Sequence, residues 1–406
     1  MKITILTQYF PPEVGAPQNR LFELAVRLQQ QGNEVTILTA MPNYPQMIVH
    51  KGYKGKWFKK ETISGLKVIR CAIYARPSRG IFSRLLNYFS FVFTSFWIGL
   101  FSLSRQDFLM VESPPLFLGK TAYLLSRIKR AKLIFNVSDL WPESAEKLGI
   151  IQNKTILKLT TLLEEFFYRK SHLITGQTQG ICNNIKNRFP NKDVYWLPNG
   201  VDLNYYKSDI QLPSTRKQLN IQDSDFLCMY AGIIGHAQGL EVILNAAHLL
   251  KDYKDIKFLL LGSGPEKENL IQLEKKLALT NIIFHDAVGK EEMPSFVQSC
   301  NIAVIPLKKL DLFRGAIPSK IFENLAMKKP IVLGVEGEAK DLFIDEAKAG
   351  FAFEPENATA LAHCVIQLYQ QRELVQQMGE NGKKYVAEKF TRDIIAENLR
   401  RKLETI

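Results

Sequence analysis

The sequence predicts an α/β fold of two doubly wound parallel-sheet domains, and three observations lead to this prediction. The chain has 406 residues, more than one hydrophobic core usually supports. Short apolar runs alternate with segments of helical periodicity, as in parallel sheets covered by helices. The alternation stops at residues 203–225, where polar residues and proline take over, and then starts again. We therefore expect one domain over 1–202, a linker over 203–225 and a second domain over 226–385.

The first domain opens with a strand in the first ten residues. It leads through the turn PPEVG into a helix at 17–31, in which Leu21, Leu24 and Leu28 recur at helical spacing. Further strands are expected over 34–40, 66–74, 107–113, 131–139, the first part of 172–189, and 194–202. Helices are expected over 81–104, over 118–129 and in the later part of 172–189. This alternation predicts a parallel, Rossmann-like sheet.

The second domain repeats the pattern after the linker. Strands are expected over 226–232, 257–264, 281–287, 302–307, 329–335 and 350–355. Helices are expected to begin at Leu240, Glu266, Glu291 and Ser319, with another at 357–371. A basic C-terminal helix is expected near 391–404, within the last segment, 386–406. In such sheets ligands bind beyond the carboxyl ends of the strands, so we expect an active site in a cleft where those ends of both domains meet.

Composition is that of a folded globular protein. Hydrophobic residues make up 46% and charged residues 23% of the chain, without repeats or low-complexity segments. The five cysteines are widely spaced and lack CxxC spacing, which argues against a disulfide framework or zinc site and favours a reducing compartment. Because the chain enters a strand at once, without the regions of a signal peptide, a cytoplasmic location is expected.

Positive charge indicates a polyanionic partner, and its distribution narrows the choice. The formal net charge is +13, which suits nucleic acid, anionic lipid or a phosphorylated substrate. Ten basic residues and a single acid, Glu61, lie between Lys51 and Arg84, and residues 85–104 directly afterwards carry no charge. Twenty such residues could cross a bilayer, but a single span would split the first domain. A buried helix, or one lying at the membrane interface beside the basic stretch, is favoured.

Glycine-containing turns between strands and helices are candidates for phosphate binding. Glycine lets the backbone approach a ligand, and a helix start offers free N–H groups. Gly15 precedes the first helix, although a plain turn would look similar. The sequence YAGIIGHAQGLEVI supplies Gly232, Gly235, His236, Gln238 and Gly239, and the next strand is followed by Gly262 and Gly264. The spacing differs from the dinucleotide-binding GxGxxG motif of oxidoreductases.

Charged groups suited to a nucleoside diphosphate follow in RGAIPSKIFENLAMKKPIV. Arg314 and Lys320 can neutralise diphosphate oxygens, Ser319 stands at the helix start, and Glu323 can accept hydrogen bonds from ribose hydroxyls. A solvated helix with an acid in its first turn is the simpler alternative.

On the first domain, Asp139 and Glu143 follow a strand in NVSDLWPESA. They could orient or deprotonate an acceptor hydroxyl, or Asp139 could only cap a helix. The Asp223-Ser224-Asp225 pattern precedes a strand and is interpreted as a turn. The six histidines lack metal-ligand spacing, so neither an obligate metal nor another cofactor is expected.

Taken together, PPEVGAPQNR, DLWPES, LPNGVD, AGIIGHAQGLE, LGSGPEK and PSKIFENLAMKKPIV resemble the GT4 family of retaining glycosyltransferases over nearly the whole chain. The likeness extends to bacterial O-antigen and capsule enzymes that transfer N-acetylated amino sugars such as N-acetyl-L-fucosamine. It implies a GT-B fold, a UDP-sugar donor, a lipid-linked acceptor such as an undecaprenyl-diphosphate-linked saccharide, and retention. It places Gly15 near donor or acceptor, Lys320 at the diphosphate and Glu323 at the ribose.

This chain departs from the family pattern in the donor region. Ile233 and Gln238 stand where many members have Arg and Lys, and Gly315 replaces a glutamate eight residues before Glu323. Two other functions remain as alternatives: a UDP-sugar 2-epimerase of similar architecture, and a polyanion-binding protein without catalysis. Nucleic acid is disfavoured because the basic residues lack interleaved base-stacking motifs.

Overall fold

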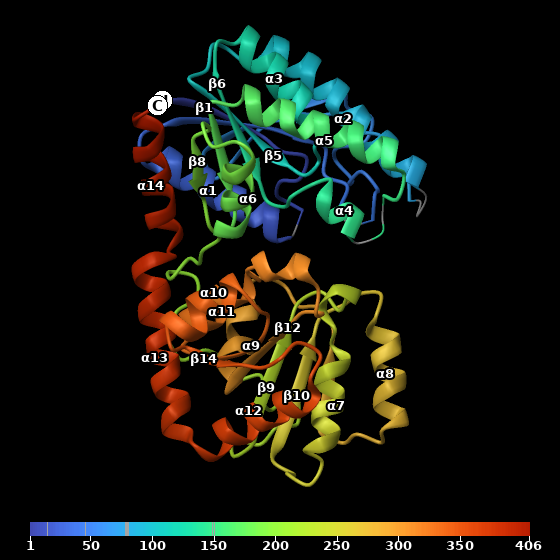
Figure 1. The fold of residues 1–406 in the computed structure, drawn as a ribbon, viewed down its shortest axis with the longest axis vertical. Coiled ribbons are helices and arrows are strands. Elements are labelled where there is room, and N and C mark those ends of the chain that lie inside the picture. The colour runs from blue at the N-terminus through green and yellow to red at the C-terminus, as the bar shows by residue number, and fades with distance from the viewer. Residues whose placement is uncertain (14, 45, 78–80, 148, 150) are drawn as a thin grey trace. The chain divides into compact units, whose positions relative to one another are not determined.

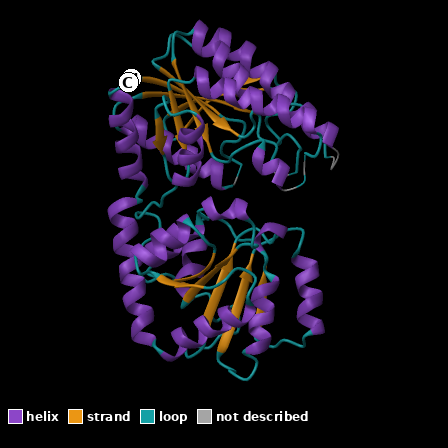
Figure 2. Cartoon of the chain, viewed as in Figure 1, coloured by secondary structure: helices purple, strands orange, loops and turns teal. Residues whose placement is uncertain are grey.

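The computed structural model describes residues 1–13, 15–44, 46–77, 81–147, 149 and 151–406, which divide into two compact units (Figure 1). Unit 1 comprises Met1–Pro198 and Arg392–Ile406, and unit 2 comprises Asn199–Thr391. Each unit has a central sheet flanked by helices (Figure 2). The architecture is the GT-B class of α/β fold, with two doubly wound sheets.

Unit 1 contains an eight-stranded sheet in the order β3-β4-β2-β1-β5-β6-β7-β8. Its strands are β1 (Lys2–Leu6), β2 (Glu34–Ala40), β3 (Phe58–Ile63), β4 (Leu66–Cys71), β5 (Phe108–Ser113), β6 (Lys132–Val137), β7 (Leu173–Gly176) and β8 (Val194–Trp196). Every neighbouring pair is parallel except β3 and β4. Strands β2, β5 and β6 are almost continuously buried because helices cover both faces, as parallel sheets require. The edge strand β3 instead alternates between exposed and half-buried residues.

Helices of unit 1 form two layers. They are α1 (Ala16–Gln30), α2 (Ile81–Ser102), α3 (Leu118–Ile128), α4 (Glu143–Lys147), α5 (Lys154–Lys170), α6 (Gln179–Arg188) and α14 (Arg392–Glu404). One core cluster joins the sheet to α2, α3, α5 and α6, and the other joins it to α1 and α14. Ile395, Leu399 and Leu403 bring the last helix into this second cluster. Residues up to Lys389 still belong to the preceding helix, so the helix that returns to the first unit begins at Arg392, later than the expected boundary at 386.

Of the hairpin β3–β4, strand β4 was expected over 66–74, but β3 was not among the expected strands because its lysines hid the pattern. Ser64 and Gly65 have φ of 49° and 82°, the positive values that a tight two-residue hairpin turn needs. Lysines on an edge strand also discourage pairing with other sheets. Arg70 is fully buried here, so it does not belong to a basic surface. Of the other basic residues expected in this stretch, Arg79 lies outside the described residues.

Helix α2 carries a stripe of exposed apolar side chains along one side. They recur about every four residues: Leu85, Phe89, Phe93, Trp97 and Phe101. The opposite side packs against α3 and β4 through residues such as Phe91 and Ile98. The window Leu85–Ser102 has a mean hydropathy of 1.4 and is 33% buried, so its length and composition alone would allow it to cross a membrane. The same is true of many buried helices of globular proteins.

Unit 2 contains a six-stranded, wholly parallel sheet in the order β11-β10-β9-β12-β13-β14. Its strands are β9 (Phe226–Ala231), β10 (Ile256–Leu261), β11 (Ile282–His285), β12 (Ile302–Pro306), β13 (Ile331–Gly334) and β14 (Gly350–Ala352). Its α-helices are α7 (Glu241–Leu249), α8 (Lys267–Lys276), α9 (Met293–Ser299), α10 (Lys320–Ala326), α11 (Glu338–Lys340), α12 (Ala358–Gln370) and α13 (Arg372–Lys389). Two 3₁₀ turns, η1 (His236–Gln238) and η2 (Asp311–Gly315), and a π-helical turn, η3 (Asp341–Glu346), complete it.

The segment expected to be a linker belongs to unit 2. Its polar residues bind the body of that unit: Arg216 donates from Nε to the Ser299 carbonyl oxygen at 2.9 Å and from Nη2 to Asn301 Oδ1 at 2.9 Å. Asp225 is buried and accepts a hydrogen bond from the Gln222 amide. The stretch 203–225, expected as a linker, is thus part of unit 2, and some of its polar residues bind that unit while others, such as Lys217 and Asp223, are exposed.

Candidate functional site

Each sheet has a point where the strand order reverses, and parallel sheets bind ligands beyond the carboxyl ends of the strands at that point. In unit 1 the reversal lies between β1 and β5, and in unit 2 between β9 and β12. In unit 1 the loop after β1 holds Gly15. In unit 2 the loop after β9 holds Gly232 to Gly239, and the segment after β12 holds Arg314 and Ser319. Topology thus brings most of the sequence candidates to two strand-end edges, one in each unit.

Gly262 and Gly264 allow two loops of unit 2 to pack closely against each other. A Cβ at Gly262 would overlap the carbonyl oxygen of Gly232, and one at Gly264 would overlap that of Ile234. The loops after β9 and β10 therefore pack backbone on backbone, with the Ile234 amide donating to the Ser263 carbonyl oxygen at 2.9 Å. Gly262 and Gly264 shape the loop from behind, a task that sequence reasoning had assigned to ligand contact.

Lys320 lies directly beneath this glycine loop. Its Nζ is 3.8 Å from the centre of the Tyr230 ring, and a Cβ on Gly232 would lie 2.9 Å from the same atom. Burial lowers the pKa of Lys320 to about 7, although the negative charge of Glu323 acts in the opposite direction. The Tyr230 hydroxyl donates to the Ile233 carbonyl oxygen at 2.6 Å, which holds the ring in place. The site thus has an enclosed amine, and a bound anion would raise its pKa and favour its charged form.

Ser319 and Glu323 belong to the same element as Lys320. Ser319 precedes α10 and makes no capping hydrogen bond with its side chain, and Glu323 is half-buried in the first turn. Arg314 is exposed on η2, where it lines a small cavity of about 60 Å³ with Lys308, Lys309 and Glu336. Lys320 is the first residue of α10, in which the amides of Ile321 and Phe322 donate to the carbonyl oxygens of Pro318 and Ser319. Arg314 stands on a separate turn.

His236 and Gln238 form the 3₁₀ turn after Gly235, and Gly239 ends it with a left-handed φ of 59°. Lys308 places its Nζ 3.0 Å from His236 Nε2, and its backbone amide donates to the Ala237 carbonyl oxygen. Lys308 is a cation of this edge that the sequence did not reveal, since it follows β12 far along the chain. It brings a positive charge next to the turn that contains Gln238.

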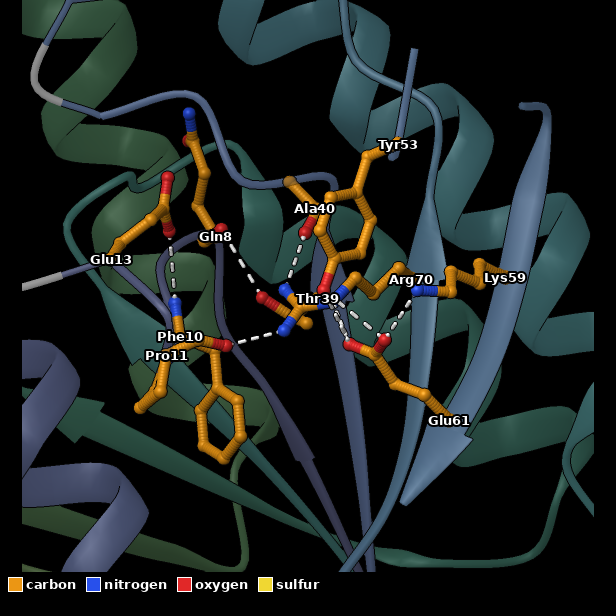
Figure 3. A network of polar contacts seen from close by, with 10 residues as sticks. All are labelled: Gln8, Phe10, Pro11, Glu13, Thr39, Ala40, Tyr53, Lys59, Glu61 and Arg70. Carbon is orange, nitrogen blue, oxygen red and sulfur yellow. Dashed lines mark hydrogen bonds and ion pairs between the residues drawn. The ribbon is translucent and has the colours of Figure 1, made fainter. Parts of the chain in front are cut away.

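The loop after β1 in unit 1 is held by buried polar contacts. Glu13 accepts hydrogen bonds from the amides of Asn43 at 2.7 Å and Tyr44 at 2.8 Å, and burial raises its pKa against these hydrogen bonds. Figure 3 shows Arg70 joining three strands: it donates to the carbonyl oxygens of Pro11 and Ala40 and to the carboxylate of Glu61. These contacts fix the path of the loop that leads to Gly15.

Gly15 itself is not required by its backbone conformation. Its φ of 172° is ordinary extended chain, and it precedes α1 without a capping side chain. A Cβ here would meet only the movable amide end of Gln18. The position is therefore suited to leave the first amides of α1 accessible to a ligand, which is the role predicted for it.

A second buried network lies at the carboxyl ends of β5, β6 and β7. Arg20 Nη2 contacts Glu112 Oε1 and Ser138 Oγ, each at 2.6 Å, and Asn136 links Glu112 to Thr175. Arg20 and Glu112 are both almost fully buried, and Arg20 Nη1 has no hydrogen-bond partner among the described residues. Sequence reasoning missed this network. The available sign was a charged residue next to each of two apolar patterns. These residues are Glu112 near the end of a strand and Arg20 near the start of a helix.

Asp139 and Glu143 differ in environment. Asp139 accepts a hydrogen bond from Ser144 Oγ at 2.9 Å. Burial raises the pKa of Asp139, the Glu143 charge adds to this effect, and the Ser144 hydrogen bond opposes it. Glu143 begins the short helix α4 and pairs with Lys147 at 2.7 Å. Asp139 is thus the carboxylate suited to proton transfer, and Glu143 is occupied by an ion pair.

Metal coordination finds no ready-made site in the described part of the chain, where no three His, Cys, Asp or Glu side chains gather as ligands. The expected independence of metal stays a prediction.

Comparisons with known proteins match both units. Residues 213–385 match the family model of glycosyl transferases group 1, and residues 18–205 match glycosyltransferase family 4. The protein named "Putative colanic acid biosynthesis glycosyl transferase WcaI" from Escherichia coli is 26% identical over 376 residues, which cover 89% of this chain and 90% of that protein.

Solved structures share the fold. A sucrose-phosphate synthase from Thermosynechococcus elongatus superposes with a TM-score of 0.76 at 15% identity, covering 100% of this chain and 98% of that one. Anabaena Alr3699/HepE, solved in complex with UDP and glucose, gives a TM-score of 0.74 at 16% identity over 100% of both chains.

Proposed function

Because the chain belongs to the GT4-like glycosyltransferases, we propose that it transfers an N-acetylated amino sugar from a UDP-sugar to a lipid-linked saccharide, with retention of configuration. The acceptor is an undecaprenyl-diphosphate-linked saccharide at the cytoplasmic face of the cell membrane. The product enters O-antigen, capsule or exopolysaccharide synthesis, in keeping with the colanic acid role in the name of WcaI.

The enclosed amine of Lys320 carries the donor part of this proposal. It lies beside the N-terminus of α10 and under the Gly232 loop, at the reversal point of the unit 2 sheet. A cation and glycines that let the backbone approach a ligand closely are features that bind a diphosphate. The choice of UDP is supported by HepE, which has been solved with UDP and with UDP-glucose. Glu323, one turn along α10, binds the ribose hydroxyls.

Transfer requires a new bond between the acceptor oxygen and the anomeric carbon, while the bond from that carbon to the UDP oxygen breaks. Lys320 stabilises the charge that develops on the leaving diphosphate. Asp139 orients the acceptor hydroxyl, since its pKa is raised by burial and its second oxygen is free of the Ser144 bond. No metal is needed in this scheme.

Membrane attachment through α2 supplies the acceptor. Phe93 and Phe101 are 58% and 81% exposed within an apolar stripe, an arrangement suited to insertion at the bilayer interface. Replacing Phe93, Trp97 and Phe101 together by serine should reduce sedimentation with vesicles, whereas Ile210→Ser with Leu249→Ser, equally exposed on unit 2, should not. Equal sedimentation of both variants would contradict this attachment.

The donor proposal is tested by calorimetric binding of UDP, GDP and ADP. We expect wild type to select UDP, and Glu323→Ala to lose about tenfold to hundredfold in affinity, the value of hydrogen bonds to a charged group. Lys320→Met should lose at least as much, and Lys340→Met, which removes an exposed lysine paired with Asp345, should bind normally. Absence of binding by every nucleotide would overturn the donor proposal.

A further inference from the structure

A basic hollow lies at the opposite end of the unit 1 sheet from the reversal point. Its lining comes from the C-terminal ends of α3 and α5 and from the amino ends of β6 and β7. It encloses about 490 Å³ and is lined by Tyr123, Ser126, Arg127, Arg130, Ala131, Lys132, Lys170 and His172. Ligands of the transferase reaction belong at the carboxyl ends of the strands, so the predicted chemistry leaves this hollow unused.

The charge of the hollow is one-sided. Its lining contains Arg127, Arg130, Lys132 and Lys170 but no acidic side chain. Lys132 Nζ donates to the oxygen of the last residue, Ile406, whereas no ion pair is found for the other three within the described ranges. Nearby cations behave differently, since Arg169 pairs with Glu165 at 2.7 Å. Helix C-termini attract positive charge, but each is equivalent to only about half an elementary charge. Two helix ends therefore do not account for the whole set.

The positive charges around the hollow affect the pKa of His172. Its pKa is lowered first by burial and then by the charges of Lys132, Lys192 and Arg127. The Leu133 amide donates to its Nδ1 at 3.2 Å, so the neutral ring carries its proton on Nε2 as a donor. A doubly charged anion in the hollow would reverse this effect and raise the pKa of His172.

The apolar stripe of α2 reaches the neighbourhood of the hollow. Lys129 Nζ donates to the Leu100 carbonyl oxygen at 2.7 Å, which ties the end of α2 to the end of α3. Leu124 and Ile128 on α3 are about half exposed beside Arg127. A ligand with a phosphate next to an apolar part would therefore find both environments on this face of unit 1.

We propose that this hollow binds a phosphate-bearing group, held by the guanidinium forks of Arg127 and Arg130 and by Lys132, Lys170 and His172. An arginine guanidinium can donate two parallel hydrogen bonds to two oxygens of one phosphate. The group is either the headgroup of an anionic lipid or a free phosphorylated compound. The binding site is separate from donor and acceptor and does not depend on the transferase activity.

The test compares the full-length double variant Arg127→Gln, Arg130→Gln with Lys275→Gln, Lys276→Gln, which removes the same charge from the exposed side of α8. One arm measures sedimentation with phosphatidylglycerol and phosphatidylcholine vesicles. The other measures calorimetric binding of pyrophosphate and glycerol 3-phosphate with the donor site saturated by UDP. Thermal unfolding confirms that both variants are folded.

A headgroup ligand predicts a fall of about 30-fold in partitioning onto phosphatidylglycerol for the arginine variant and less than twofold for the control, with two basic groups removed from the surface. A free ligand predicts the same loss in the calorimetric arm. As a readout that needs no arginine variant, the His172 ring resonances, assigned with His172→Gln, should show a pKa that rises on adding pyrophosphate or vesicles. Unchanged binding in both arms and an unchanged His172 pKa would overturn the proposal.

Discussion

The reversal points of the two sheets are built in opposite ways. In unit 2 the loops after β9 and β10 pack backbone on backbone at their glycines, and Lys320 lies beneath them. In unit 1 the corresponding loop is held by buried side chains, among them Glu13, Arg70 and the pair Arg20–Glu112. A backbone-lined site suits a phosphate, which all donors of this kind share. A site framed by side-chain networks can differ from one protein to another and suits the recognition of an acceptor.

The largest expected effect comes from breaking the unit 1 network. Arg20→Met leaves the Glu112 carboxylate buried without its partner, which should cost about 3–5 kcal/mol of unfolding free energy. Urea denaturation measures this, and Arg105→Met, at an exposed arginine, is the control. The double variant Arg20→Met, Glu112→Leu should regain most of the stability without the acceptor-dependent activity. A single variant as stable as wild type would show that the pair is not structural.

Backbone packing in unit 2 should be nearly as sensitive. Gly262→Ala places a methyl group against the Gly232 carbonyl oxygen, so the two loops must separate, and we expect a loss of about 3 kcal/mol together with weaker UDP binding. Gly289→Ala is the control, because a Cβ there meets only the Glu292 side chain at 3.5 Å. Thermal unfolding and calorimetry report both quantities, and equal effects of the two substitutions would contradict the interlocked loops.

Asp139 should affect turnover rather than donor binding. Asp139→Asn removes the carboxylate whose pKa burial raises, and we expect kcat to fall about hundredfold with UDP affinity unchanged. Glu143→Gln, at a residue paired with Lys147, should change kcat less than threefold. Comparable losses in the two variants would remove the distinction drawn between these carboxylates.

UDP affinity should depend on pH through Lys320. In the free protein the pKa is about 7, so the amine is mainly neutral above pH 7, whereas bound diphosphate favours its charged form. The contribution of Lys320 to affinity should therefore be fully present below pH 7 and fall by up to tenfold per unit as pH rises towards 9. Calorimetry at several pH values measures this, with Lys320→Arg as control, since arginine stays charged. A flat profile for wild type would exclude the enclosed amine as the diphosphate ligand.

Gly15→Ala should have the smallest effect. Its backbone is already extended and Gln18 can move aside, so we expect less than about 1 kcal/mol change in stability. A rise in KM for donor or acceptor without loss of stability would identify Gly15 as a point of ligand approach. Destabilisation as great as that of Gly262→Ala would show instead that this glycine packs the loop.

The features built from local backbone could be predicted from the sequence better than those built from long-range side-chain contacts. Strand and helix order came from local periodicity, and the glycine loops came with it because glycine and helix starts are local features. Gly262 and Gly264 were found, but their partner is the backbone of another loop, which no local pattern shows. Lys320 was identified, but not the enclosure that changes its pKa.

Long-range networks could not be predicted in this way. Arg70 was one of a run of basic residues interpreted as a surface stretch, yet its side chain is buried. It donates hydrogen bonds to the carbonyl oxygens of Pro11 and Ala40 and to the carboxylate of Glu61, which are distant in sequence. Lys308 reaches His236 across 72 positions of sequence. The segment 203–225 is the converse case, because Arg216 in this polar stretch binds the body of unit 2.

The placement of α14 has a consequence for biosynthesis. Ile395, Leu399 and Leu403 complete a core whose other members are made at the start of the chain. The ribosome therefore releases this helix only after all of unit 2 has emerged, and until then one face of the first sheet is covered by α1 without α14. The nascent first domain must wait with exposed apolar surface, a state open to aggregation or to chaperones, and a deletion at the end of the gene would damage the domain encoded at its beginning.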